Sequence, residues 1–294
     1  MYIFKAFAIP AYILSALLCT SCVREDTENC VQYALNVRAV DVEGNDLTES
    51  GVLQKSDVYL FNENGFVRMV PAGISSDFIF GEEKNAKLTL VAWGNLKEDT
   101  LVTTELAKGT PIEEAKIQLR RHAEGTHIPI TDLFYSRKEL SRIQTRSMPE
   151  ESVTLVMERM VAGVSIRTRY LAERYPYNGV PYHFIVRGTG TEMDFMGRTV
   201  GEDVGYKPAS TTDNTGDVYA PPFHIFTMQE GGMIEIDIYR EQERIYTITE
   251  DNNFKPLRVT VGKQTNIDID FRYAKVQTSI TVVPWGEVWQ DTEM

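Results

Sequence analysis

The chain has 294 residues, of which 43% are hydrophobic and 24% are charged, and its formal net charge is −12. The hydrophobic share is large enough to build packed cores, which excludes an intrinsically disordered chain. The excess of acidic residues repels phosphate groups, so nucleic acids are excluded as partners. The length suits two domains of ordinary size better than one.

The amino-terminal residues indicate export. Lys5 precedes an apolar run that ends at Leu18, and this run is shorter than the roughly 20 residues that a membrane-spanning helix needs. A positive charge followed by a short apolar run is typical of a signal peptide. We therefore expect residues 1–21 to be removed, with cleavage between Ser21 and Cys22.

The tripeptide Thr20-Ser21-Cys22 resembles the end of a bacterial lipobox, whose cysteine receives the lipid. Cys19 departs from the leucine that is usual at its position, and an ordinary secretory signal is the alternative. Cleavage removes Cys19 and lipidation uses Cys22, so the mature chain keeps only Cys30 and forms no internal disulfide. We expect lipid attachment at Cys22 and a flexible tether over residues 22–31.

Alternation of apolar and polar residues predicts a series of strands in the first half. The apolar residues Leu35, Val37 and Ala39 alternate with polar residues. An Asn-Gly turn follows the apolar run at residues 58–61, as in a hairpin. Further strands are predicted at residues 88–93, 117–119, 133–135 and 153–157. Residues 97–115 and 137–149 are predicted to be loops, the first with at most one helical turn.

A second series of strands begins almost directly after the strand at residues 153–157, which places a domain boundary near Arg159. Ile236 and Ile269 each lie at the centre of an alternating run, so we expect them to share one interior, with Glu235 and Asp268 exposed. The excursion from residue 188 to 220 is rich in Gly, Thr and Asp and is predicted to be a loop with little core. Strands are predicted at residues 162–167, 183–186, 234–238, 245–248, 259–261, 267–271 and 280–285.

Many short strands with turn signals and almost no helix indicate an all-β protein made of antiparallel β-sandwiches. We expect two such domains in tandem, over residues 32–159 and 160–294. No linker rich in Pro, Gly or Ser separates them, so the two domains should be joined closely.

The common templates of catalysis are absent: there is no nucleophile elbow, no phosphate-binding Gly loop and no Cys pair. Asp213 begins a run like a calcium loop, but His224 stands where that loop needs a glutamate, so a turn is favoured. The sequence therefore predicts no enzyme, no cofactor and no metal site. Its four histidines, which lack metal-ligand spacing, are His122, His127, His183 and His224.

Several segments, taken in their order along the chain, resemble the fimbrial anchor subunits of Bacteroidales, the FimB/Mfa2 family. The resemblance implies two transthyretin-like β-sandwich domains in tandem, the first of them near the lipid. The segments are the lipobox at Cys22 followed by Cys30, the hairpin at residues 58–65, the strand Leu-Val-Ala-Trp-Gly-Asn at residues 90–95 and the junction at residues 153–162.

The resemblance also implies a function, that of a non-catalytic subunit that attaches or terminates fimbriae at the cell outer membrane. Its implied partners are the membrane, through the lipid on Cys22, and stalk or accessory pilins bound by β-strand addition, in which one chain completes the open sheet edge of another. The implied location is the outer membrane, surface-exposed as part of a fimbrium. The short segment after Trp285 would suit the last subunit of a polymer.

A surface glycan-binding lipoprotein is the alternative, because such proteins use the same anchor and similar β-sandwiches. Trp93, Trp285 and Trp289 could stack on sugars, although aromatic residues in sheet proteins more often fill cores. Exposed coplanar aromatic rings would favour the glycan-binding protein. An open sheet edge or a continuous apolar groove would favour the fimbrial anchor.

Overall fold

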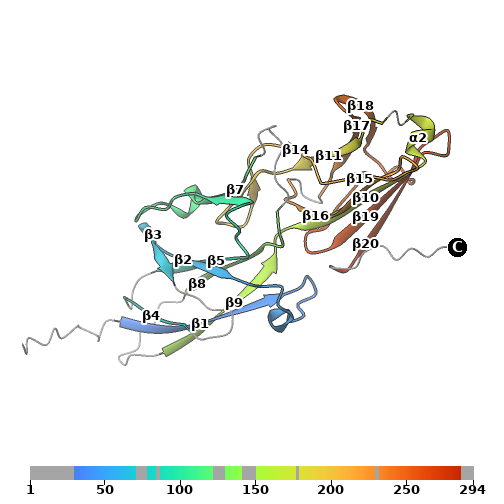
Figure 1. Ribbon diagram of the computed structural model, residues 1–294. Helices are drawn as coiled ribbons and strands as arrows, with labels where there is room; N and C mark the ends of the chain where they lie inside the picture. Colours follow the sequence, from blue (N-terminus) through green and yellow to red (C-terminus); the bar gives the residue numbers. More distant parts are fainter. Residues whose placement is uncertain are drawn as a thin grey trace, which may run out of the picture.

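The computed structural model describes residues 30–70, 78–83, 87–121, 130–140, 150–176, 179–228 and 232–285. Strands make up most of these residues, and Figure 1 shows them along an elongated molecule. The prediction of an all-β protein is confirmed. The predicted signal peptide lies outside the described residues, and β1 begins at Cys30, inside the range predicted as tether.

The first half forms a seven-stranded sheet with the order β3-β2-β5-β8-β9-β1-β4. Its neighbours are antiparallel, except that β1 runs parallel to β9. The strands are β1 (Cys30–Val40), β2 (Ser56–Asn62), β3 (Gly65–Val70), β4 (Phe78–Glu83), β5 (Leu88–Gly94), β8 (Phe134–Leu140) and β9 (Glu150–Arg159), and a short 3-10 helix, η2 (Thr48–Ser50), follows β1.

The loop predicted from residue 137 onward starts too early, because β8 continues to Leu140. The residues of β8 from Arg137 to Glu139 are exposed, and the side chains of Arg137 and Glu139 form an ion pair at 2.9 Å. Charge in this stretch therefore reflects a solvated strand surface and not the end of the strand.

Strands β2 and β5 are buried on both faces, which explains why their sequences are almost continuously apolar. Val58 and Leu60 point into a core inside the seven-stranded sheet, whereas Tyr59 and Phe61 point into a second core on the opposite face. Trp93 on β5 belongs to this second core and is fully buried. A further layer must therefore cover the outer face of the sheet.

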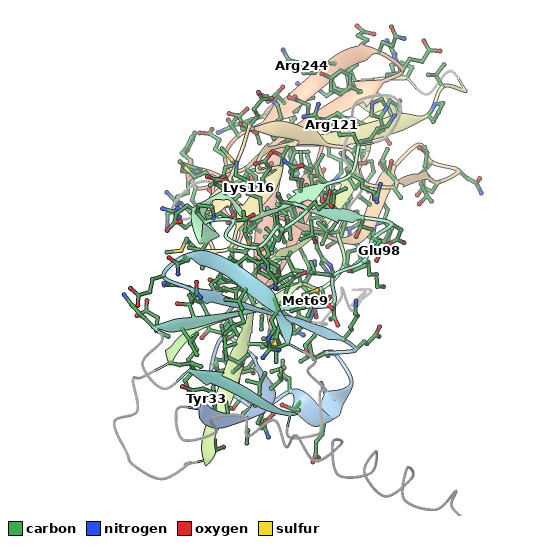
Figure 2. All side chains as sticks on the ribbon, turned by 90° about the vertical axis from the view of Figure 1, so that its left-hand side faces the viewer. Tyr33, Met69, Glu98, Lys116, Arg121 and Arg244 are labelled. Atoms are coloured by element: carbon green, nitrogen blue, oxygen red, sulfur yellow. The ribbon has the colours of Figure 1, made fainter. Side chains whose placement is uncertain are left out.

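That layer is a small four-stranded sheet, with the order β13-β12-β7-β6, which takes strands from both halves of the chain. Figure 2 shows Lys116 of β7 between Tyr33 at one end of the molecule and Arg244 at the other. The predicted boundary near Arg159 stays a prediction, but strands from both sides of it share this sheet. They are β6 (Leu101–Thr103), β7 (Lys116–Leu119), β12 (Glu192–Asp194) and β13 (Thr199–Val200), with a 3-10 helix, η3 (Ile112–Glu114), before β7.

The interpretation of residues 188–220 as a loop with little core is wrong. This stretch contains β12 and β13, the short strands β14 (Val204–Tyr206) and β15 (Thr211–Thr212), and the start of β16 (Val218–Ile225). The buried residues of the stretch are separated by turns, so no period of two appears in the sequence. They include Met193, Phe195, Tyr206 and Val218.

Phe195, just after β12, is the centre of an aromatic cluster that joins the two halves. Its fully buried ring meets Tyr59, Phe61 and Trp93 at centroid distances of 5.0, 6.0 and 5.8 Å, each edge to face. Edge-to-face pairs at such distances are favourable beyond the area they bury. The hydroxyl of Tyr135 on β8 also donates to the Phe195 carbonyl at 3.0 Å.

The second half is a β-sandwich of two sheets, with the orders β15-β16-β10-β19-β20 and β14-β11-β17-β18. Ile236 and Ile269 are fully buried in one core, which confirms that they share an interior. The remaining elements are β10 (Ala162–Arg169), β11 (Tyr182–Thr189), β17 (Glu235–Arg240), β18 (Glu243–Ile248), β19 (Gln264–Asp270), β20 (Gln277–Val283) and the short helix α2 (Leu171–Arg174).

Asp268 is not the exposed residue that its alternating pattern predicts. Its side chain is only 15% exposed, and it accepts hydrogen bonds from Arg167 at 3.0 Å and Arg169 at 3.1 Å. Both arginines lie on the neighbouring strand β10, where Arg167 pairs in register with Asp268. A polar residue at a solvent-facing position can thus be covered by long side chains from the next strand.

Replacing Phe195 by Ala should lower the free energy of unfolding by about 3–5 kcal/mol, because a fully buried ring leaves a cavity between the two halves. Urea titration of the purified protein measures this change. The matched control is Phe254→Ala, since Phe254 is 70% exposed and should change stability by less than about 1 kcal/mol. Equal shifts in the two variants would contradict the role given to Phe195.

Candidate functional site

Cys22, the predicted site of the lipid, and Ser21, the residue before the predicted cleavage, lie outside the described residues, as do His122 and His127. Lipid attachment therefore stays a prediction. No helix in the described part of the chain is both long and apolar enough to cross a membrane. Within the described ranges, no three His, Cys, Asp or Glu side chains are grouped so that they could hold a metal ion.

The run that begins at Asp213 forms a turn, as the sequence favoured. Asp213 Oδ1 accepts hydrogen bonds from the backbone N–H groups of Thr215 and Asp217, both at 2.9 Å. The Gly216 N–H donates to the Asp213 carbonyl at 3.1 Å. This carboxylate oxygen is thus used to hold its own loop.

The free edge of β20 is the clearest candidate for binding another chain. In an antiparallel pair, residues whose main-chain groups face the partner strand alternate with residues whose groups point away from it. Thr278 is of the second kind, because its N–H donates to Asn252 Oδ1 at 2.6 Å and its carbonyl accepts from the Asn252 N–H at 3.0 Å. Ile280 and Val282 share this parity in the pairing with β19, and no described residue pairs with their outward main-chain groups.

Strand β20 lacks the features that normally protect an edge. Charged side chains, proline and bulges keep edge strands from pairing with other chains. The sequence of β20 is Gln-Thr-Ser-Ile-Thr-Val-Val, with no charge and no proline, and its pairing with β19 shows no register shift. By contrast, the edge strand β18 begins with Glu243 and Arg244.

The core-facing side of β20 becomes more exposed toward the end of the strand. Thr278 is buried, Ile280 packs partly against the core, and Val282 is 46% exposed. A strand added along this edge would satisfy main-chain groups and also remove Val282 from water. Both gains favour an added strand with uncharged side chains.

A rigid loop after β18 closes one end of this edge. Asp251 Oδ1 accepts from the N–H groups of Asn253 at 2.8 Å and Lys255 at 2.9 Å, which fixes the turn that carries Asn252. Phe254 in this turn has a positive φ of 59°, a conformation that bulky side chains rarely adopt. Because both outward main-chain groups of Thr278 are already hydrogen-bonded to Asn252, the open part of the edge runs from Ser279 to Val283.

The other end of β20 leads to a buried charge cluster at the junction of the two halves. The Arg159 guanidinium, with its side chain only 3% exposed, binds Asp132 at 2.9 Å. It also lies over the rings of Phe134 and Trp285, at 5.0 and 4.6 Å from their centroids. Trp285 stacks in turn on His224, at 4.7 Å between ring centroids.

Burial changes the protonation of two groups in this junction cluster. It raises the pKa of Asp132 to about 6, although the Arg159 charge acts in the opposite direction. It lowers the pKa of His224 to about 4. His224 Nδ1 donates to the Ile130 carbonyl, 3.1 Å away, since a carbonyl oxygen only accepts.

The tryptophans named in the sequence have different environments. Trp93 is in the core, and Trp285 is stacked within the junction cluster. Trp289 lies outside the described residues.

The hydrogen bonds of Asn252 to Thr278 and the pair of Arg159 with Asp132 were not anticipated from the sequence, because the two partners of each contact are far apart along the chain. The only local signal was the turn chemistry of Asp251-Asn252-Asn253.

Comparison with known proteins decides the family. The family described as fimbrillin-A associated anchor proteins Mfa1 and Mfa2 matches residues 24–291. This chain belongs to that family. The resemblance found in the sequence is therefore confirmed.

Individual relatives agree with the family. The chain is 27% identical to the major fimbrium anchoring subunit FimB of Porphyromonas gingivalis, over 96% of this chain and 98% of that protein. The solved fimbrial anchor protein Mfa2 of Porphyromonas gingivalis has a TM-score of 0.62 and 14% identity, over 87% of this chain and 98% of that one. A Bacteroides thetaiotaomicron protein proposed to bind polysaccharide has a TM-score of 0.63 and 13% identity, over 86% and 98%.

Replacing His224 by Gln should change how the stability of the protein depends on pH. The pKa of His224 falls from its ordinary 6.5 to about 4 in the folded state, so its contribution to stability grows as the pH rises through this range and is lost below it. The difference in unfolding free energy between wild type and variant should therefore increase from pH 4 to 6.5, by at most about 3 kcal/mol. Urea titrations at several pH values measure it.

Asp132→Asn is the matched control with the opposite sign. The pKa of Asp132 is raised from 3.8 to about 6, so its contribution to stability falls as the pH rises through that range. The difference between wild type and this variant should shrink over the same range. Slopes of the same sign for both variants would contradict the assignment of the two groups.

Proposed function

We propose that this protein holds a fimbria to the outer membrane of a bacterial cell and catalyses no reaction. Residues 1–21 are removed as a signal peptide, and Cys22 carries the lipid, palmitate included, that inserts into the membrane. Of the residues 22–31 that the sequence predicted as a tether, those before β1, which begins at Cys30, link this lipid to the folded body. Membership of the fimbrial anchor family over residues 24–291 is the observation that supports the proposal most strongly.

The folded body binds a stalk or accessory pilin by β-strand addition at the free edge of β20. The outward main-chain groups of Ile280 and Val282, the absence of charge on β20 and the exposure of Val282 support this mode. In Figure 1, β1, which follows the tether, and β20 belong to different halves of the elongated molecule. The lipid and the pilin therefore act at separate places on a surface-exposed protein.

This function is favoured over that of a lipoprotein whose main role is to bind surface glycans through its tryptophans. Such a surface needs exposed tryptophan rings side by side, whereas Trp93 is buried and Trp285 stacks on His224. An open and unprotected sheet edge is the feature expected of a fimbrial anchor.

Cys22→Ala should prevent lipid attachment and release fimbriae into the culture medium, because the body then has no acyl chains to hold it in the bilayer. Fractionation of cells and medium, followed by immunoblotting for the stalk pilin, measures the release. Mass spectrometry of the wild-type protein should find an acylated amino-terminal Cys22. Fimbriae that stay on Cys22→Ala cells as on wild-type cells would contradict the anchoring role.

Val282→Pro should release fimbriae while leaving both lipid attachment and folding intact. The Val282 N–H points away from β19, so proline removes no bond within the sheet but blocks the edge. Retention of fimbriae on cells and the urea midpoint of the purified variant are the two measurements.

The matched control is Thr281→Pro on the neighbouring residue, whose N–H faces Asn266 of β19. Proline there removes a ladder hydrogen bond and should lower the stability of the protein. Val282→Pro cells that keep their fimbriae would exclude β20 as the docking edge, whatever the outcome for Cys22.

A further inference from the structure

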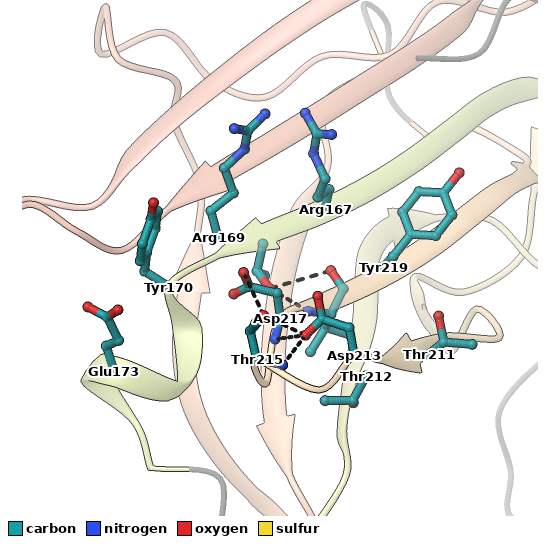
Figure 3. Close-up of a pocket in the computed structure, with 12 residues that line it drawn as sticks. Arg167, Arg169, Tyr170, Glu173, Thr211, Thr212, Asp213, Thr215, Asp217 and Tyr219 are labelled. Carbon is teal, nitrogen blue, oxygen red and sulfur yellow. Dashed lines mark hydrogen bonds between the residues drawn. The ribbon is translucent and has the colours of Figure 1, made fainter. Parts of the chain in front are cut away.

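A pocket of about 490 Å³ lies at the end of β10 in the second half of the chain. Its walls come from the end of β10, the start of α2 and the hairpin from β15 into β16 (Figure 3). The pocket is separate from the candidate edge of β20, which lies on the opposite margin of the same five-stranded sheet. Cavities of roughly 300–1,000 Å³ are typical of small-ligand sites.

Two tyrosine rings stand on opposite sides of this pocket, as Figure 3 shows for Tyr170 and Tyr219. Tyr219 on β16 pairs in register with Arg167 on β10, so both side chains project from the same face of the sheet. Tyr170 precedes α2 with a positive φ of 60°, is 37% exposed, and has the Arg272 guanidinium over its ring, 4.7 Å from the centroid. Such a backbone is unfavourable for a bulky residue and persists only where its surroundings fix it.

Polar oxygen atoms line the floor between the rings. The loop from Asp213 to Asp217 is held by its own hydrogen bonds, and Asp217 Oδ1 also accepts from the Leu171 N–H at 3.1 Å. Asp217 Oδ2 makes a long contact of 3.5 Å with the Thr215 hydroxyl, and the Tyr170 backbone also donates to this carboxylate. The pKa of Asp217 is raised, chiefly by burial, so this carboxylate would gain from a further hydrogen-bond donor.

The charges around the pocket exclude an anionic ligand. Its lining holds two guanidinium groups and three carboxylates. Arg167 and Arg169 are both paired with Asp268 behind them, at 3.0 and 3.1 Å. The net charge is therefore negative, and a phosphate or a uronic acid would be repelled.

We propose that this pocket binds a neutral saccharide, with one or two sugar rings between Tyr170 and Tyr219. The apolar C–H faces of a sugar pack on aromatic rings, while its hydroxyl groups donate to carboxylates and threonine hydroxyls. The pocket offers both kinds of contact in a preformed loop, which limits the entropy lost on binding. The saccharide site is a second function, and it does not depend on the fimbrial role.

The test uses the full mature chain and uncharged hexasaccharides of glucose, mannose, galactose and N-acetylglucosamine, with hexagalacturonate as the charged comparison. Saturation-transfer NMR detects binding and calorimetry measures its affinity. At least one neutral hexasaccharide should bind and hexagalacturonate should not. Tyr219→Ala should weaken this binding about tenfold or more, and Tyr219→Phe should keep it within about twofold.

Tyr239→Ala is the matched control, because Tyr239 lies on β17 of the other sheet and outside the pocket. It should bind the saccharide as the wild type does, and so should Val282→Pro, which affects only the edge of β20. The proposal fails if no neutral hexasaccharide binds, if hexagalacturonate binds equally well, or if Tyr219→Ala leaves the affinity unchanged.

Discussion

The insertion of Phe195 into the outer face of the first sheet is the contact on which the rest of the structure depends. Without the hairpin of β12 and β13, Tyr59, Phe61 and Trp93 would lose the ring that packs on all three of them, and exposed apolar faces associate with other chains. The outer face of the first sheet is therefore covered by segments from both halves of the chain. This constraint also fixes how the sandwich of the second half is held beside the first sheet.

Local periodicity predicted most strands, because one buried face imposes a period of two on the sequence. It failed over residues 188–220, where Phe195 finds its partners on strands more than a hundred positions earlier. It also failed at Asp268, which alternation places in water but whose side chain is only 15% exposed beside Arg167 and Arg169 of the next strand. The strand β20 was predictable, but its free edge was not, because only the pairing order decides which strands lie at an edge.

Charge is arranged differently in the interior and along the free edge. Among the described residues, the buried charges of Arg159 and Asp237 have partners from elsewhere in the chain, Asp132 and Arg187. An unpartnered charge there would be strongly unfavourable. Along β20 there is no charge at all, in a chain in which 24% of residues are charged. The edge is therefore compatible with main-chain pairing.

The parallel pairing of β1 with β9 has a mechanical consequence. The two strands are in register from Gln32–Glu150 to Val40–Glu158, and β9 leads almost directly into β10. A pull between the start of β1 and the end of β9 acts along both strands in opposite directions, so the hydrogen bonds between them are loaded in shear and must break together. Peeling, in which bonds break one after another, would need far less force. Tension along the route from the amino end to the second half is thus carried by hydrogen bonds that are loaded in shear.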